Sequence, residues 1–301
     1  RVASRGLGDV YKRQSYGCLD PLALNFDPSA TITDNSCLYT LMGCINPLAS
    51  NYDSTATNDD GSCYFLGCID SLACNYDSSA DTTDGSCFYG NCVENITQDN
   101  FYSTIQPAIN ESNDGDTIIV STGTYVENLA IEAKTIVLAS KFLLTNDTSY
   151  ISSTIIDGNT SASVIRITHD YQTYPSFSIP QIIGFDIRNG SEDASLGWSP
   201  GNGAGIYIKG WTSPIIKYCD INNNGGQLGG GISIAGDIYY GNAQNCKPIF
   251  ENLSVRDNNS GSYGGGGVYF ENSSYPTFTN IDFINNSGYE GGAVYTRAND
   301  S

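Results

Sequence analysis

Basic residues, histidine and methionine are scarce in this sequence of 301 residues. It contains 13 Lys+Arg against 32 Asp+Glu, one histidine and one methionine, and its formal net charge is −19. A chain this acidic repels phosphate groups, which argues against nucleic acids as partners. Its apolar stretches are short or interrupted by charged residues, so we predict no membrane insertion in this segment.

The single histidine and the abundant turn-forming residues narrow the possible functions and fold classes further. No serine or cysteine motif stands beside His169, so a catalytic triad is not expected, and we interpret this residue as part of a turn. Glycine (33) and tyrosine (21) are plentiful, together with Asn, Ser and Thr. This mixture favours many short strands joined by tight turns, and we predict an all-β protein.

The first residues differ in character from the rest. Residues 4–14 read SRGLGDVYKRQ, a string that resembles the translation of a sequencing adaptor, and we interpret residues 1–14 as an artefact that is not native to the protein. Without them 13 bases fall to 9 and 32 acids to 31, so the formal charge becomes −22. A change of composition near Gly90 then separates residues 15–90 from residues 91–301.

Residues 15–90 contain three cysteine-rich repeats. In each of three cysteine pairs the two cysteines are nineteen positions apart, and each pair encloses a similar sequence that begins with Gly-Cys and ends with Ser-Cys. Modules this small bury little apolar surface, so disulfides are expected, and the alternative of structural zinc lacks close cysteine or histidine spacing. The predicted disulfides are Cys18–Cys37, Cys44–Cys63, Cys68–Cys87 and Cys74–Cys92. Disulfides predict a secreted or cell-surface protein.

Each repeat also carries a recurring set of side-chain oxygens. Calcium prefers such carboxylate and amide ligands, whereas the alternative is that the same side chains close Asx turns. The candidate ligands are Asp20, Asn25, Asp27, Asn46, Asn51, Asp53, Asp70, Asn75 and Asp77. The repeats resemble the Gly-Cys-x-Asp-Pro-x-Ala-x-Asn-Tyr-Asp…Asp-Gly-Ser-Cys modules of large secreted bacterial surface proteins. That resemblance implies an extracellular location and no particular activity; calcium is the one cofactor considered.

The second region opens with a predicted helix and continues in short strands. Residues 103–112 place Ile105, Ala108 and Ile109 at helical spacing. Several phrases of the region, Thr104–Ile109, Asp114–Ile118, Gly123–Glu127 and Thr154–Gly158, resemble the opening of pectin-lyase-like proteins. The resemblance implies a right-handed parallel β-helix, a solenoid with a short N-terminal capping helix over its core.

Prolines set the register of a downstream repeat. Apolar residues recur two, five and seven positions after Pro180, Pro214, Pro248 and Pro276. Columns in constant register predict coils about 4.8 Å apart, with the columns inside. The three columns are Ile182, Ile216, Phe250 and Phe278; Phe185, Cys219, Leu253 and Ile281; and Ile187, Ile221, Val255 and Phe283. Cys219 and Cys246 are expected to be free thiols, and asparagines after each coil are expected to form a ladder.

The last coil has no partner in this sequence, so we expect the chain to be truncated at its C-terminus. Glycine-rich phrases such as Gly265-Gly-Gly-Val-Tyr-Phe270 resemble the repeats of polymorphic outer-membrane adhesins.

Residues predicted to point outward from the coils are the candidate site residues. One column is acidic, the next is basic and a third is aromatic: Asp186, Asp220 and Asp282; Arg188 and Arg256; Tyr207, Tyr269 and Tyr295. In enzymes of this fold acids and an arginine perform lyase or hydrolase chemistry. The alternative is a solvated strand face with Asp–Arg pairs between strands. An exposed tyrosine column suits sugar stacking, and equally suits stacking between coils.

Two functions follow from these patterns. The favoured one is a non-catalytic secreted or cell-surface β-helix module for adhesion or glycan contact, whose partners are extracellular glycans or a neighbouring or host surface. The alternative is a carbohydrate-active enzyme, either a polysaccharide lyase or a glycoside hydrolase. The fold supports both, so the site has to decide between them.

Overall fold

The computed structural model describes residues 14–90, 92–170, 177–191, 205–235, 246–261, 264–271 and 274–297. The adaptor-like segment lies outside them except for its last residue. The chain divides into two units, residues 1–88 and 89–301, and each is described by itself. No helix in these ranges is long and apolar enough to cross a membrane.

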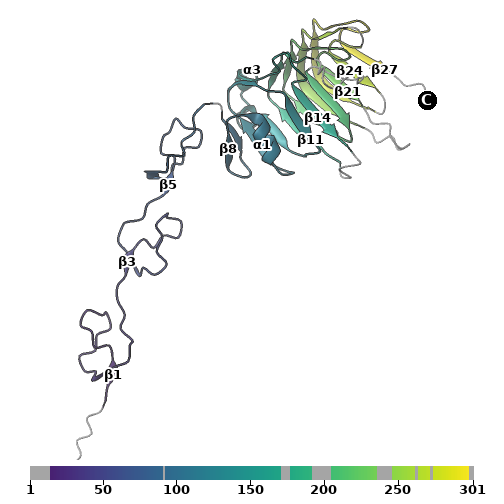
Figure 1. The fold of residues 1–301 in the computed structure, drawn as a ribbon. Coiled ribbons are helices and arrows are strands. Elements are labelled where there is room, and N and C mark those ends of the chain that lie inside the picture. Colours follow the sequence, from purple (N-terminus) through teal and green to yellow (C-terminus); the bar gives the residue numbers. More distant parts are fainter. Residues whose placement is uncertain are drawn as a thin grey trace, which may run out of the picture. The chain divides into compact units, whose positions relative to one another are not determined.

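The first unit consists of three modules, each with one pair of short parallel strands (Figure 1). The strands are β1 (Tyr16–Gly17) with β2 (Ile32–Thr33), β3 (Met42–Gly43) with β4 (Asn58–Asp59), and β5 (Leu66–Gly67) with β6 (Thr82–Thr83). The core of each module is minimal, because the buried hydrophobic residues are one cysteine and one alanine. They are Cys18 and Ala23, Cys44 and Ala49, and Cys68 and Ala73.

A disulfide closes each of these modules. The bonds Cys18–Cys37, Cys44–Cys63 and Cys68–Cys87 each join Cα atoms 4.8 Å apart, which confirms three predicted pairs. Cys74 and Cys92 are also disulfide-bonded. They pair with each other, because the three bonds above use six cysteines and Cys219 and Cys246 are free thiols. Four disulfides are typical of an extracytoplasmic protein.

The second unit is a parallel β-helix whose coils stack strand upon strand (Figure 1). Its first elements are β7 (Val93–Asn95), β8 (Asn100–Tyr102), α1 (Ile105–Glu111), β9 (Thr117–Val120), β10 (Gly123–Val126), β11 (Leu129–Glu132), β12 (Val137–Ser140), α2 (Phe142–Thr145), α3 (Ser149–Ser153), β13 (Thr154–Asp157) and β14 (Ile165–His169). The next are β15 (Gln181–Ile183), β16 (Asp186–Arg188), β17 (Ile206–Gly210), β18 (Ile215–Lys217), β19 (Asp220–Asn222), β20 (Gly225–Gly226) and β21 (Ile232–Ala235). The last are β22 (Ile249–Arg256), β23 (Asn259–Ser260), β24 (Val268–Glu271), β25 (Thr277–Ile284), β26 (Ser287–Gly288) and β27 (Val294–Arg297).

Three parallel sheets run along the stack. The largest has the order β10-β13-β16-β19-β22-β18-β15-β12-β9-β7-β8 with β25 on β22, and only β7 pairs antiparallel, with β8 and β9. A second sheet is β11-β14-β17-β21-β24-β27, and a third is β20-β23-β26. The sense of the coil, predicted right-handed, stays a prediction.

The proline-based register is confirmed. Ile182 pairs with Ile216, Ile216 with Phe250 and Phe250 with Phe278 on successive coils. The column of Ile187, Ile221, Val255 and Phe283 is likewise in register. These side chains belong to one continuous hydrophobic core. Helix α1 adds Ile105, Ala108 and Ile109 to that core, as the capping helix was predicted to do.

The N-terminus of helix α1 is capped by a side chain from outside the helix. Thr104 makes no side-chain capping bond. Instead, the Glu127 carboxylate accepts hydrogen bonds from the backbone N–H groups of Ile105 and Gln106, at 2.8 and 3.0 Å. The sequence around the helix does not reveal this cap, because Glu127 lies between β10 and β11.

Asparagine recurs at two neighbouring positions in the turns that follow β16, β19, β22 and β25. Asn189, Asn223 and Asn285 adopt φ values of 56°, 53° and 51°, a left-handed conformation that asparagine tolerates well. The following residues form the predicted ladder: Asn224 Nδ2 donates to Asn258 Oδ1, and Asn258 Nδ2 to Asn286 Oδ1, both at 3.0 Å. The ladder satisfies buried amides that would otherwise weaken the core.

Candidate functional site

The acidic and basic columns lie in the predicted register. Asp186, Asp220, Ser254 and Asp282 face one another on successive coils, as do Arg188, Asn222 and Arg256. Side chains of neighbouring coils therefore meet at one strand spacing, about 4.8 Å. That closeness allows bonds between coils, and the acids and arginines make them.

Arg256 and Asp220 form a two-pronged pair between coils. Arg256 Nε lies 3.0 Å from Asp220 Oδ1, and Arg256 Nη2 lies 2.6 Å from Asp220 Oδ2. The hydrogen bond to Asp220 raises the pKa of the Arg256 guanidinium, which stays charged. An arginine held in this way is a structural partner and a poor proton acceptor.

Asp186 differs from the solvated position that was predicted, because it is only 7% exposed. Its Oδ1 accepts a hydrogen bond of 2.8 Å from Asn222 Nδ2, and Arg188 Nη1 lies 3.8 Å from its Oδ2. Burial raises the pKa of the Asp186 carboxyl despite the bond from Asn222. Arg188 Nε also lies 3.7 Å from Asp157 Oδ2 on the preceding coil. The paired-face alternative therefore fits both arginines.

A surface groove of about 270 Å³ crosses three coils beside these pairs. Polar groups recur along it where each chain turn meets the following strand. They are Tyr218, Asp220, Asn252, Ser254, Asn280 and Asp282, with Ile151, Cys219 and Leu253 completing the wall. Asn280 Nδ2 donates to Asn252 Oδ1 at 2.6 Å, which links two of the coils at the groove.

Tyr218 is the unusual residue of this groove. Its φ is 54°, whereas the equivalent positions on neighbouring coils hold Gly184, Asn252 and Asn280, residues that accept such a backbone readily. The strain of a bulky left-handed residue costs on the order of 1–3 kcal/mol, and such strain concentrates at functional sites. The ring packs against Phe142 with centroids 4.8 Å apart and remains partly exposed.

The tyrosine column was predicted to be exposed, and that prediction is wrong. Tyr207 and Tyr269 are 4% and 1% exposed, and Tyr295 is half-buried. Tyr269 stacks on Tyr295 with ring centroids 5.9 Å apart, and its hydroxyl donates to Glu271 at 2.6 Å. Rings stacked between coils use the very faces that a sugar would need. Burial also raises the pKa of Tyr207 to about 12.

The candidate calcium ligands close turns within each module. Asp20 Oδ1 accepts from the backbone N–H of Leu22 at 2.9 Å, and Asp27 Oδ1 from that of Ser29 at 2.8 Å. Asn25 bridges the carbonyl of Ser36 and the N–H of Leu38. The same bonds recur in the other modules at Asn46, Asn51, Asp53, Asp70, Asn75 and Asp77. Among the described residues no three His, Cys, Asp or Glu side chains converge as a metal site would require.

His169 was interpreted as a turn residue, and this is also wrong. It is the last residue of β14, is buried, and its Nδ1 lies 2.8 Å from Ser178 Oγ. A second groove of about 280 Å³ passes this place, lined by Glu132, Thr168, His169, Asp170, Lys209 and Gly210. Ser178 is itself buried and does not line that groove, so the pair is not a nucleophile open to substrate.

The free thiols are both buried. The Cys246 thiol donates to the Thr212 carbonyl at 3.0 Å, and its backbone pairs with that of Ser274 on the next coil. Cys246 therefore lies outside the three apolar columns that follow the prolines. Burial raises the pKa of Cys219 and of Cys246 to about 12, which keeps both protonated and unreactive.

Known proteins include a distant structural likeness to this chain. No family model matches the chain, and no curated protein matches it. Among solved structures it is similar to the pectin methylesterase from Aspergillus niger in deglycosylated form, with 15% identity and a TM-score of 0.23 over 66% of this chain and 87% of the other. The fold described above rests on the strand pairing of the chain itself.

Proposed function

We propose that this protein is a non-catalytic, secreted or cell-surface module whose β-helix binds extended neutral glycans in the groove around Tyr218. The observation that supports this most strongly is the repetition of amide, hydroxyl and carboxylate groups on three successive coils beside a partly exposed, strained aromatic ring. Sugars offer hydroxyls to such polar groups and an apolar ring face to an aromatic side chain.

Charge favours a neutral ligand over a polyuronate. The net charge of −19 repels polyanions, and the arginines that could offset it already bind Asp220 and Asp186. Because Tyr207 and Tyr269 are buried, we propose that glycans contact this groove and not the tyrosine column.

Calorimetry with neutral xylan and mannan oligosaccharides, and with polygalacturonate as the anionic comparison, tests the proposal. Tyr218→Gly keeps the left-handed backbone while removing the ring, and we expect binding of the neutral glycan to weaken about threefold to tenfold, from ~0.5–1.5 kcal/mol per aromatic contact. Tyr289→Gly, at an exposed tyrosine outside the groove, is the control and should change nothing. Equal binding of neutral glycans to the two variants would contradict the proposal. So would a native chain that binds no neutral glycan.

The enzyme alternative has its own test. The residues that a lyase or hydrolase would use are Asp186, Asp220, Asp282, Arg188 and Arg256. Of these, Asp220 and Arg256 form an ion pair with each other. Incubation with polygalacturonate and calcium should give no unsaturated product by ultraviolet absorbance, which detects a lyase, and no new reducing ends, which detect a hydrolase. Steady product formation that disappears in Asp220→Asn would replace the binding function by catalysis.

A further inference from the structure

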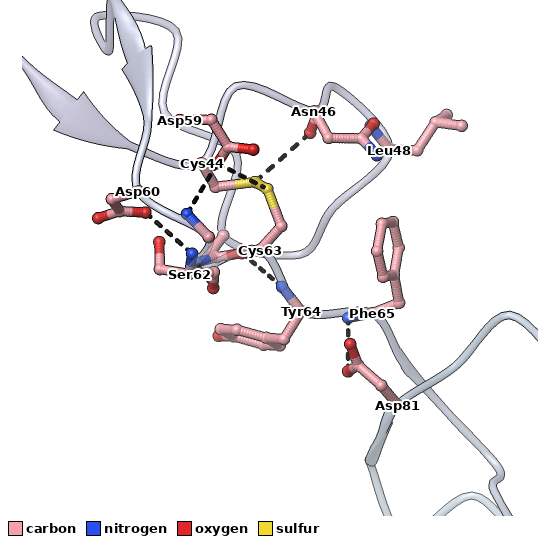
Figure 2. Close-up of a disulfide and its surroundings, with 12 residues drawn as sticks. Cys44, Asn46, Leu48, Asp59, Asp60, Ser62, Cys63, Tyr64, Phe65 and Asp81 are labelled. Carbon is pink, nitrogen blue, oxygen red and sulfur yellow. Dashed lines mark hydrogen bonds between the residues drawn. A yellow bond between two sulfur atoms is a disulfide. The ribbon is translucent and has the colours of Figure 1, made fainter.

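Three leucines stand almost fully in solvent at the same place in the three modules. Leu22, Leu48 and Leu72 are 86%, 85% and 85% exposed. Figure 2 shows the side chain of Leu48 directed away from the disulfide and its surroundings. A leucine that touches so little of its own module contributes almost nothing to folding, so folding does not explain why it recurs.

Repetition within the chain distinguishes these leucines from scattered exposed residues. The next exposed apolar residue, Leu24, is replaced by Ser50 and Cys74 in the other modules, whereas the position of Leu22 holds leucine every time. Three more positions are apolar and exposed in every module: Tyr16, Met42 and Leu66; Leu19, Ile45 and Ile69; and Phe26, Tyr52 and Tyr76.

The turn that carries each leucine is fixed by hydrogen bonds. The backbone N–H groups of Leu22, Leu48 and Leu72 donate to the side-chain oxygens of Asp20, Asn46 and Asp70 at 2.9, 3.0 and 2.9 Å. A disulfide closes the same module, so little further ordering is needed when a partner binds.

Charge selects the kind of partner. Residues 15–90 contain ten aspartates and no lysine, arginine, histidine or glutamate, and residues 91–301 hold 21 acids against 9 bases. A second copy of this chain is therefore repelled, and an anionic surface is repelled as well. A cationic protein surface that also offers apolar side chains matches both the aspartates and the leucines.

We propose that the three modules are a repeated docking site for a basic, apolar surface of another protein, with Leu22, Leu48 and Leu72 as its anchoring side chains. Each contact is small, and three on one chain act together through their high effective concentration. The residues of this site and those of the glycan groove belong to different units of the chain.

The test uses the full chain and an immobilised amphipathic helical peptide made of leucine and lysine. The variant Leu22→Ser/Leu48→Ser/Leu72→Ser should bind about tenfold more weakly or worse, since anchoring residues dominate such interfaces. The matched control is Leu24→Ser/Leu41→Ser/Leu144→Ser, three exposed leucines whose positions are not repeated as leucine, and it should bind as the native chain does. A peptide with glutamate in place of lysine should not bind.

Three results would overturn this inference. They are unchanged binding of the leucine/lysine peptide after the three anchoring substitutions, an equal loss in the control variant, and equal binding of the glutamate peptide. Intact disulfides and an unchanged melting curve, expected because the substituted side chains are in solvent, ensure that a loss of binding is not a loss of fold.

Discussion

In the β-helix most large aliphatic side chains of the repeat are buried, whereas in the cysteine modules they lie in solvent. Ile187 and Ile221 are completely buried in adjacent coils, while Leu22 and Leu48 are exposed in adjacent modules. Both regions are repeats, but a coil covers the next coil and a module of this size has no core to offer. The difference shows that repetition in sequence can serve stability in one region and surface presentation in another.

Reduction of the disulfides should separate the two regions most strongly. Each bond closes a loop worth about 3 kcal/mol in the chain-entropy model, so reduced modules should open while the β-helix persists. Limited proteolysis of the full chain, with mapping of the cleavage sites, should show cuts within residues 15–90 about a hundredfold faster after reduction. Equal acceleration within residues 92–170 would mean that the β-helix also depends on the disulfides.

The same type of truncation should have opposite consequences in the two regions. Ile221→Ala removes a fully buried side chain and should lower the free energy of unfolding of the β-helix by about 2–5 kcal/mol. Leu48→Ala should change stability by less than ~0.5 kcal/mol, because the side chain is exposed. Urea unfolding followed by circular dichroism measures both, and similar costs would remove the distinction.

The asparagine ladder should be the next most costly feature to break. Asn258→Ala removes the oxygen that accepts from the backbone and side-chain N–H groups of Asn224, and the donor to the Ile221 carbonyl, at a cost of about 1–3 kcal/mol. Asn223→Gly, which keeps a positive φ at an exposed position, is the control and should be tolerated. If the two variants have the same unfolding midpoint, the ladder does not stabilise the coils.

Mild acid should produce the smallest effect, with opposite signs in the two regions. Hydrogen bonds from Ser36 and Ser62 lower the pKa of Asp34 and Asp60, so their contribution to module stability is lost only as pH falls below 3.8 through these lowered values. Burial raises the pKa of Asp186, so the β-helix regains stability as pH falls from that raised value towards 3.8.

Asp186→Asn isolates the second of these effects. The stability difference between the native chain and this variant should narrow as pH falls from 7 towards 3.8, as measured by urea unfolding with tryptophan fluorescence. A difference that stays constant with pH would show that the Asp186 carboxyl titrates normally.

The register of the coils and the disulfides could be predicted because both are written as spacings along one chain. Pro180 to Pro276 mark the columns, and the nineteen-residue interval marks each disulfide. The errors concern contacts between coils that spacing does not reveal. The alternation of side chains along the strand correctly placed Tyr269 on the outward face, yet Tyr295 and Glu271 contact it there. His169 lies beside Ser178, a residue outside its own strand.

The groove was missed for the same reason. Tyr218 and Asn280 look like ordinary turn residues in the sequence, and their common wall exists only once three coils are stacked. The one signal that could have found it is a tyrosine at the position that glycine or asparagine holds in the other coils.

Covalent footprinting of aliphatic side chains in the full chain separates the exposed leucines of the modules from the buried isoleucines of the coils. Diazirine labelling with mass spectrometry should modify Leu22, Leu48 and Leu72 as strongly in the native chain as in the denatured chain. Ile187 and Ile221 should be modified only after denaturation. Protected module leucines, or native labelling of the isoleucine columns, would contradict the account.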